Sequence, residues 1–285
     1  MGEPRGGGAA EPSVGGRVYH LGLAPGDVAR YVLLPGDPGR ASLIASLWDE
    51  AELKASKREF TTYTGRYRGV PISVTSTGIG APSAAIAVEE LLRVGADTFI
   101  RVGTMGALRA SLRPGTLVIA PAAVRMEGAS GQYAPPGYPA YASPTVFMAL
   151  VEAAESLGVN YEVGVVASTD SFYLGQGRPG YGGYMTPWAA SVIPALREAG
   201  VVGFEMEASA IFTLSAIYGA RAGCVCAVVA NRATDEFAPE AGVREASRVA
   251  SEAVAVLSEW DEATGRAGAR CFHPGVLRST WRSGT

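Results

Sequence analysis

Lysine, cysteine and long apolar runs are all scarce in this 285-residue sequence. No apolar stretch approaches the roughly 18 residues that cross a bilayer, which argues against a transmembrane helix. Three cysteines cannot all pair within one chain. Cys224 and Cys226 lie in an apolar run, so we expect thiols in a protein core and a reducing compartment. The net charge of −3 offers no bulk attraction to nucleic acid or an anionic membrane, so any anion needs a local site.

The positive charge is carried almost entirely by arginine. Only Lys54 and Lys57 among the 24 basic residues are lysines, and the fork-shaped guanidinium group suits phosphate binding. The glycine-rich start lacks the apolar centre of a secretory signal, so we expect a flexible lead-in over residues 1–17 and a cytoplasmic protein. Residues 264–285 are predicted to form an irregular tail.

Between these tails, apolar β-rich runs alternate with amphipathic helical patterns. This alternation predicts one α/β domain over residues 18–263, with a central mixed, barrel-like sheet flanked by helices. Proline stands near the start of several expected helices, as helix entry favours. The expected strands are residues 31–34, 58–67, 71–76, 98–102, 116–120, 163–167 and 223–230. The expected helices are residues 38–47, 82–94, 144–157, 187–199, 205–218 and 239–259.

The first candidate site is a glycine turn between the apolar run that ends at Leu34 and a helix that begins at Asp37-Pro38. Backbone N–H groups at a helix start attract anions, and Arg40 can add a charged fork beside Gly36. An ordinary turn is the alternative interpretation. The Walker A pattern is absent, so this turn is not a P-loop.

Arg101 lies inside an otherwise apolar strand. A buried charge is costly unless it is paired, so Arg101 either binds an anion or forms an ion pair with a core carboxylate. Thr104, just beyond the expected strand end, could add a hydroxyl and a backbone N–H to the same anion.

Three further motifs are ambiguous by themselves. The run 56–60 contains Arg58 and Glu59 and resembles a solvated charge cluster, while 76–83 is another glycine-rich turn. Glu205 and Glu207 open an expected helix, where the helix dipole alone would favour acids. A carboxylate held there could instead accept hydrogen bonds from the two hydroxyls of a ribose.

These motifs occur together in one order: Pro-Gly-Asp-Pro-x-Arg, Arg-Glu-Phe-Thr-Thr, Ser-Thr-Gly-Ile-Gly-x-Pro-Ser, Arg-Val-Gly-Thr-x-Gly and Phe-Glu-Met-Glu. The set resembles the nucleoside phosphorylase-I superfamily and, within it, the uridine phosphorylases. The resemblance runs from Val18 through Arg232 and into the last helix. It implies a homo-oligomeric, hexameric enzyme of nucleoside catabolism and pyrimidine salvage, whose active sites are shared between subunits.

The resemblance also assigns roles to individual residues. It implies a phosphate site formed by Gly36, Arg40, Arg101 and Thr104, with Arg58 reaching in from a neighbouring subunit. It places Met206 and Glu207 on the ribose, with the neighbour's His20 over the 5′-hydroxyl; a structural histidine is the alternative for His20. It further implies a monovalent cation such as K⁺ at the subunit interface, held by Glu59, Ile79 and Ser83.

The expected base pocket combines Phe172, Gln176 and Arg178 with Arg232. The Gln176 amide can both donate and accept, as the adjacent C=O and N–H groups of uracil require. The segment Val229-Ala230-Asn231-Arg232 resembles that of the uridine phosphorylases, and it lacks the Ser-Asp pair that purine-cleaving relatives usually place around here, which favours a pyrimidine.

The expected reaction is phosphorolysis of uridine to uracil and ribose 1-phosphate, with Gln176, Arg178, Arg101 and Glu207 as the catalytic set. The arginines hold the phosphate, and the base-pocket groups stabilise charge on the leaving uracil. The reaction needs no cofactor beyond inorganic phosphate as co-substrate, and no nucleic acid or membrane partner is expected. A purine or broad-specificity phosphorylase, a hydrolytic nucleosidase and a non-catalytic nucleoside-binding protein are the alternatives.

Overall fold

Strand β7 (Thr98–Ala107) is the central strand of the computed structural model, which describes residues 7–277. Strand β14 (Arg221–Asn231) runs parallel to it along its whole length. On the other edge, β3 (Tyr31–Leu34) pairs in parallel with the first half of β7, and β13 (Gly203–Glu205) pairs antiparallel with its end. The sheet is therefore mixed, as the sequence predicted.

This sheet has 13 strands within the described chain, and the other two strands form a separate hairpin. The remaining sheet strands are β4 (Glu50–Lys57), β5 (Phe60–Tyr67), β6 (Val70–Thr75), β8 (Leu117–Ile119), β9 (Ala122–Met126), β10 (Ala140–Tyr141), β11 (Tyr161–Val163), β12 (Val166–Thr169) and β15 (Glu236–Phe237). The helices are α1 (Pro38–Ala45), α2 (Ala81–Arg93), α3 (Pro144–Ser156), α4 (Pro187–Glu198), α5 (Ala208–Ile217) and α6 (Val243–Arg266).

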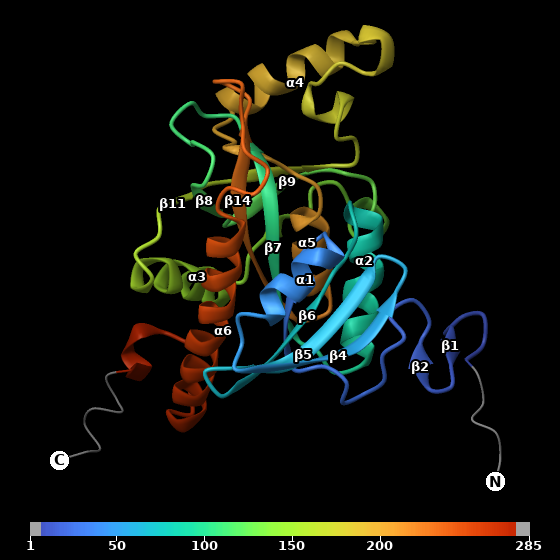
Figure 1. Cartoon of the computed structure of the whole chain (residues 1–285), viewed down its shortest axis with the longest axis vertical. Coiled ribbons are helices and arrows are strands. Elements are labelled where there is room, and N and C mark those ends of the chain that lie inside the picture. The colour runs from blue at the N-terminus through green and yellow to red at the C-terminus, as the bar shows by residue number, and fades with distance from the viewer. Residues whose placement is uncertain (1–6, 278–285) are drawn as a thin grey trace.

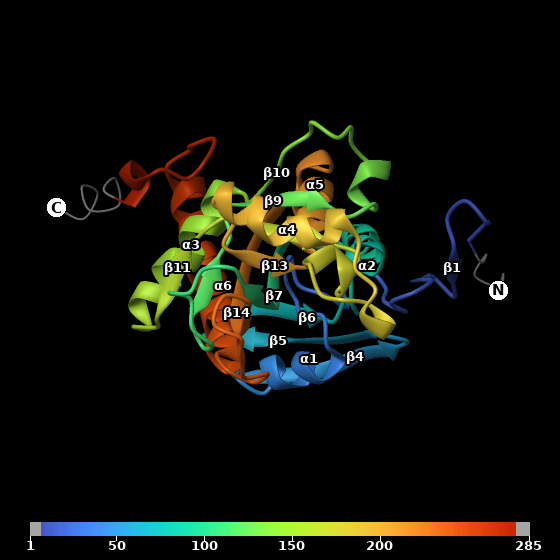
Figure 2. The ribbon, with the colours of Figure 1, turned by 90° about the horizontal axis from the view of Figure 1, so that it is seen from above.

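Helices cover both faces of the sheet (Figure 1). Helices α3 and α6 pack against each other and β14 on one side, and α2 packs against α5 on the other. The side chains of β7 alternate between the two faces of the sheet. Phe99 and Met105 pack in one apolar cluster, and Ile100 and Val102 pack in the other. Figure 2, seen from above, shows α1 below the strands β5 and β6 and α4 on the opposite side.

Two predicted elements need correction. The strand expected over 163–167 is two strands, because the chain changes partner: β11 ends at Val163 beside β8, and β12 starts at Val166 beside β9 and β13. The helix expected from Glu205 begins at Ala208, because the Glu205 carboxylate accepts the N–H groups of Glu207 and Ala208 from its place in β13.

The chain ends also differ from the prediction. Short strands β1 (Ser13–Val14) and β2 (Arg17–Val18) form a hairpin that starts within the expected lead-in and ends one residue beyond it. Helix α6 starts at Val243 rather than 239 and continues to Arg266, beyond the expected limit at 259. Residues 1–6 and 278–285, parts of the expected lead-in and tail, lie outside the described residues. Within 7–277, no helix combines the length and apolarity needed to cross a membrane.

Candidate active site

The candidate site is a cavity of about 920 Å³ at the ends of strands β3, β7, β13 and β14. It brings together most of the residues that the sequence singled out, from segments far apart in the chain. Those lining it are Gly36, Arg40, Glu59, Ile79, Ser83, Arg101, Thr104, Phe172, Gln176, Arg178, Met206, Glu207 and Arg232.

The turn after β3 places the first arginine. Asp37 caps α1 by accepting the Gly39 N–H at 2.8 Å, and a side chain at Gly36 would lie 3.1 Å from the Gly78 carbonyl oxygen. The Arg40 N–H donates to the Asp37 carbonyl, but its guanidinium makes no hydrogen bond or ion pair with any residue in 7–277. Burial lowers the pKa of its guanidinium, and the like charge of Arg101 lowers it further. An unpaired, half-buried cation beside a second cation is a favourable place for an anion.

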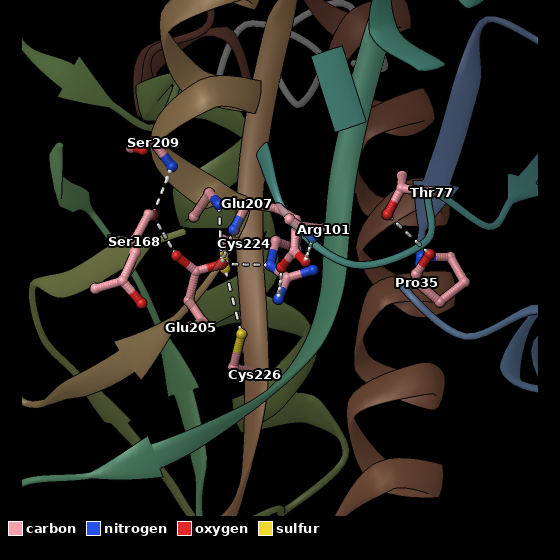
Figure 3. A network of polar contacts seen from close by, with 12 residues as sticks. Pro35, Thr77, Arg101, Ser168, Glu205, Glu207, Ser209, Cys224 and Cys226 are labelled. Carbon is pink, nitrogen blue, oxygen red and sulfur yellow. Dashed lines mark hydrogen bonds and ion pairs between the residues drawn. The ribbon is translucent and has the colours of Figure 1, made fainter. Parts of the chain in front are cut away.

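Arg101 is ion-paired and also lines the cavity, while its predicted contact with an anion stays a prediction. Its side chain is buried, and its Nε donates to Glu205 Oε2 at 2.6 Å while Nη2 is ion-paired with Glu207 Oε2 (Figure 3). The alternative expectation of a buried ion pair is therefore confirmed, yet Arg101 also lines the cavity. Burial alone would lower the pKa of Arg101, but Glu207 and Glu205 outweigh it and raise the pKa.

The two acids after β13 have different surroundings. Glu205 accepts hydrogen bonds from Arg101, from the first N–H groups of α5 and from the Ser168 hydroxyl, which accepts in turn from the Ser209 N–H (Figure 3). Glu205 therefore fixes the arginine and the helix start. Glu207 lines the cavity and does not cap α5 with its side chain.

The Glu207 carboxylate is held from two sides. Oε1 accepts the Gly80 N–H at 2.5 Å, and Oε2 contacts Arg101. Burial raises the pKa of Glu207, the attraction of Arg101 only partly offsets this, and the like charge of Glu205 raises the pKa further. This division between the two acids could not be predicted, because Arg101 and Glu205 are 104 residues apart in the chain.

The expected base pocket is organised around Gln176, which is 3% exposed. Its Nε2 donates to Thr169 Oγ1 at 3.1 Å, and its Oε1 accepts from Arg178 at 2.6 Å. Arg178 lies 4.0 Å from the centre of the Phe172 ring, and Arg232 donates to the Gln176 carbonyl at 3.0 Å. One N–H and one acceptor position of the amide remain available to a ligand.

Burial of Arg178, reinforced by the charge of Arg232, lowers the pKa of its guanidinium to about 10. Two adjacent guanidinium groups create a positive field toward the cavity. Such a field stabilises negative charge on a bound group.

His20 and Arg58 do not line this chain's main cavity. His20 borders a second cavity of about 640 Å³ between the amino-terminal hairpin and α2. Arg58 is exposed, in the two-residue turn between β4 and β5, with a left-handed φ of 55°. Their expected action across a subunit interface stays a prediction.

The sequence missed three lining residues that follow β14. Asp235, Glu236 and Phe237 border the cavity beside Arg232, and Phe237 is 72% exposed. Strand β15 contains only two residues, and neither is buried, so no apolar pattern announces it. The predicted cation ligands Glu59, Ile79 and Ser83 do meet here, with Ser83 Oγ donating to Glu59 Oε1 at 3.1 Å.

Comparison with known proteins adds independent information. Residues 30–259 match the model of the phosphorylase superfamily. A uridine phosphorylase of Thermococcus kodakarensis is 61% identical over 92% of this chain and 94% of its own. A uridine phosphorylase of Escherichia coli is 43% identical over 77% and 88%, and a guanosine phosphorylase of Halorubrum lacusprofundi is 41% identical over 74% and 83%.

Proposed function

This chain belongs to the phosphorylase superfamily, and we propose that it is a uridine phosphorylase, which cleaves uridine with inorganic phosphate to uracil and ribose 1-phosphate. One observation carries the proposal: a single cavity contains the Arg40 guanidinium, unpaired within residues 7–277, beside Arg101, together with a buried Glu207 and the pair Gln176–Arg178. These groups match a phosphate, a ribose diol and a uracil respectively.

The reaction follows from these placements. The C1′–N1 bond lengthens first, so positive charge grows on the ribose and negative charge on the uracil. A phosphate oxygen, held by Arg40 and Arg101, forms the new bond to C1′, and uracil leaves with the electron pair and takes a proton from solvent. Gln176 and Arg178 hydrogen-bond the uracil oxygens where the charge develops, and the nearby Arg232 adds positive field.

Pyrimidine specificity rests on Gln176 and on Asn231. Asn231 lines the cavity, but its amide is fully used by the main chain: Nδ2 donates to the carbonyls of Arg109 and Leu112, and Oδ1 accepts the N–H groups of Ala233 and Thr234. No acid replaces it at this position to protonate a purine ring. We therefore favour uridine over guanosine, despite the guanosine phosphorylase among the similar proteins.

The active site is proposed to be completed by a second subunit. Lys57, next to Arg58, donates to the carbonyl of Tyr19, next to His20, so one surface region carries both residues. We propose that this region meets the neighbour's cavity, with Arg58 on the phosphate and His20 on the ribose 5′-hydroxyl, in a cytoplasmic hexamer that acts in pyrimidine salvage.

A monovalent cation such as K⁺ is proposed at the same interface. The Glu59 carboxylate and the Ser83 hydroxyl are hard oxygen donors held within hydrogen-bond distance, and the exposed turn at Ile79 offers a backbone carbonyl. The donor chemistry fits, and the cation would neutralise Glu59 beside the cavity.

The test is a panel of uridine, thymidine, inosine and adenosine, each assayed with and without phosphate. We expect uridine to be cleaved only with phosphate and to yield ribose 1-phosphate. Cleavage without phosphate would identify a nucleosidase, and faster cleavage of inosine would identify a purine enzyme. Binding without turnover of any substrate would identify a nucleoside-binding protein.

A further inference from the structure

His20 is held by a carboxylate from a distant helix. Glu90 on α2 lies 70 residues away, and its Oε1 is 2.7 Å from His20 Nδ1. The same carboxylate accepts the backbone N–H of His20 at 3.0 Å and the N–H of Leu21 at 2.8 Å. One acid therefore fixes both the main chain and the ring of this histidine.

Glu90 is only 5% exposed, whereas the His20 side chain is 28% exposed. A buried carboxylate needs several donors, and these three contacts supply them. A carboxylate only accepts, so the ring nitrogen that faces it carries a hydrogen. In the neutral ring, Nε2 is then the free acceptor.

The segment that carries His20 is also held through its neighbour Tyr19. Lys57 Nζ lies 4.7 Å from the centre of the Tyr19 ring, and that ring meets His20 edge to face with centroids 4.9 Å apart. With Glu90 behind and Tyr19 beside it, the imidazole has little freedom to turn.

We propose that Glu90 is the positioning residue of His20, which it fixes in the Nδ1–H tautomer so that Nε2 accepts from the ribose 5′-hydroxyl. This inference rests on the proposed function, in which His20 faces a neighbour's ribose. It makes Glu90, outside the main cavity, responsible for discrimination between nucleosides with and without a 5′-hydroxyl.

The first test reads the ring itself. Long-range ¹H–¹⁵N spectra of the whole enzyme, at a pH where the ring is neutral, should show His20 with hydrogen on Nδ1. In Glu90→Gln, one acceptor oxygen cannot serve three donors, so the spectrum should shift toward a mixture of tautomers. A wild-type ring with hydrogen on Nε2 would overturn the proposal whatever the enzyme catalyses.

The second test compares kcat/KM for uridine and 5′-deoxyuridine. Wild-type enzyme should prefer uridine, and Glu90→Gln should reduce this preference by roughly 2- to 10-fold, the range of one neutral hydrogen bond. His20→Ala should give the same reduction, and the double variant should add nothing further. Glu89→Gln, one residue earlier and bonded to Tyr218 and Arg93, is the matched control and should keep the preference.

The outcomes separate the two proposals. Absence of uridine phosphorolysis in wild-type enzyme would refute the proposed function but leave the tautomer result standing. Normal cleavage with an undiminished preference in Glu90→Gln would refute the positioning role alone. If Glu90→Gln does not fold, Glu90→Asp, which keeps the charge on a shorter side chain, should give the same loss of preference in smaller measure.

Discussion

Glu205 and Glu207 show how position decides the task of two identical side chains. Both are buried and both contact Arg101. Glu205 is surrounded by donors from Ser168, Glu207 and Ala208, so it stabilises the site. Glu207 has one backbone donor, from Gly80, and it faces the cavity. The acid with fewer protein donors is the one prepared to accept from a ligand.

Glu207→Gln keeps the size of the side chain but removes the charge that strengthens hydrogen bonds to a diol. We expect kcat/KM for uridine to fall by roughly 10- to 100-fold, equivalent to about 1.5–3 kcal/mol for hydrogen bonds to a charged group. The loss with 2′-deoxyuridine should be smaller, because that substrate has one hydroxyl fewer. Equal losses with both substrates would exclude a contact between Glu207 and the 2′-hydroxyl.

The raised pKa of Glu207 predicts a pH effect in the same pair of enzymes. In the folded protein Glu207 stays protonated at pH values above 4.5, the ordinary pKa of a glutamate. Activity that needs the Glu207 carboxylate should therefore decline as the pH falls through the raised pKa. The free energy of unfolding changes in the opposite direction. At a pH between 4.5 and the raised pKa, the native state binds more protons at Glu207 than the unfolded state does, so the stabilisation from Glu207 falls as the pH rises.

The measurement is the ratio of kcat/KM between wild type and Glu207→Gln across pH. The titration of phosphate itself is common to both enzymes and cancels in that ratio. As the pH is lowered, this ratio should begin to decline at a pH above 4.5, the ordinary pKa of a glutamate. A ratio that is flat with pH would contradict the assignment.

At the scale of elements, the sequence predicts what is decided locally. Strand β3 is found at its true bounds because four buried residues are followed at once by Pro35-Gly36. Strand β4 is missed because most of its side chains are exposed, so it lacks an apolar pattern. The chain also gives no sign of the partner change between β11 and β12.

The candidate site was predictable for a related reason. Its residues lie in short motifs at strand ends, where an arginine or a glycine is conspicuous in an apolar setting. What could not be predicted are contacts between distant segments, such as Glu205 with Arg101 or Glu90 with His20. The packing of the whole chain determines these contacts, and the spacing of residues in the sequence does not indicate them.

Arg58, in the β4–β5 turn, has a left-handed backbone conformation that asparagine and glycine adopt more easily than arginine. A left-handed φ costs a residue with a Cβ roughly 1–2 kcal/mol, and asparagine tolerates it better than arginine. Arg58→Asn should therefore match or exceed wild-type stability by up to about 1 kcal/mol. If Arg58 binds phosphate, the same change should raise KM for phosphate roughly 10- to 100-fold.

Thermal unfolding and phosphate titrations on one preparation check both effects. Arg68 is the control, because it occupies the corresponding turn between β5 and β6 with φ 50° and is paired with Glu252. Arg68→Asn should leave KM for phosphate unchanged. A destabilised Arg58→Asn enzyme with normal KM would make Arg58 a structural residue.

At the scale of the whole molecule, the proposed shared site predicts that one chain alone holds an incomplete site. Its cavity has Arg101 and Glu207, while His20 and Arg58 project from another part of the surface. A two-fold symmetric dimer resolves this, because each subunit would give one patch to its partner and receive the same patch in return. We therefore predict that the minimal competent unit is the dimer.

Mixing two impaired variants, assayed with uridine at low phosphate, tests this arrangement. Arg58→Ala damages the site that its subunit completes, and Arg101→Ala damages the site in its own subunit. After subunit exchange, each mixed dimer would hold one intact site and one doubly damaged site. With random pairing at equal amounts, about one quarter of all sites would be intact, so activity should rise toward that fraction of wild type. Exchange proven by labelled subunits, without recovery of activity, would place both residues in the site of one chain and end the shared-site proposal.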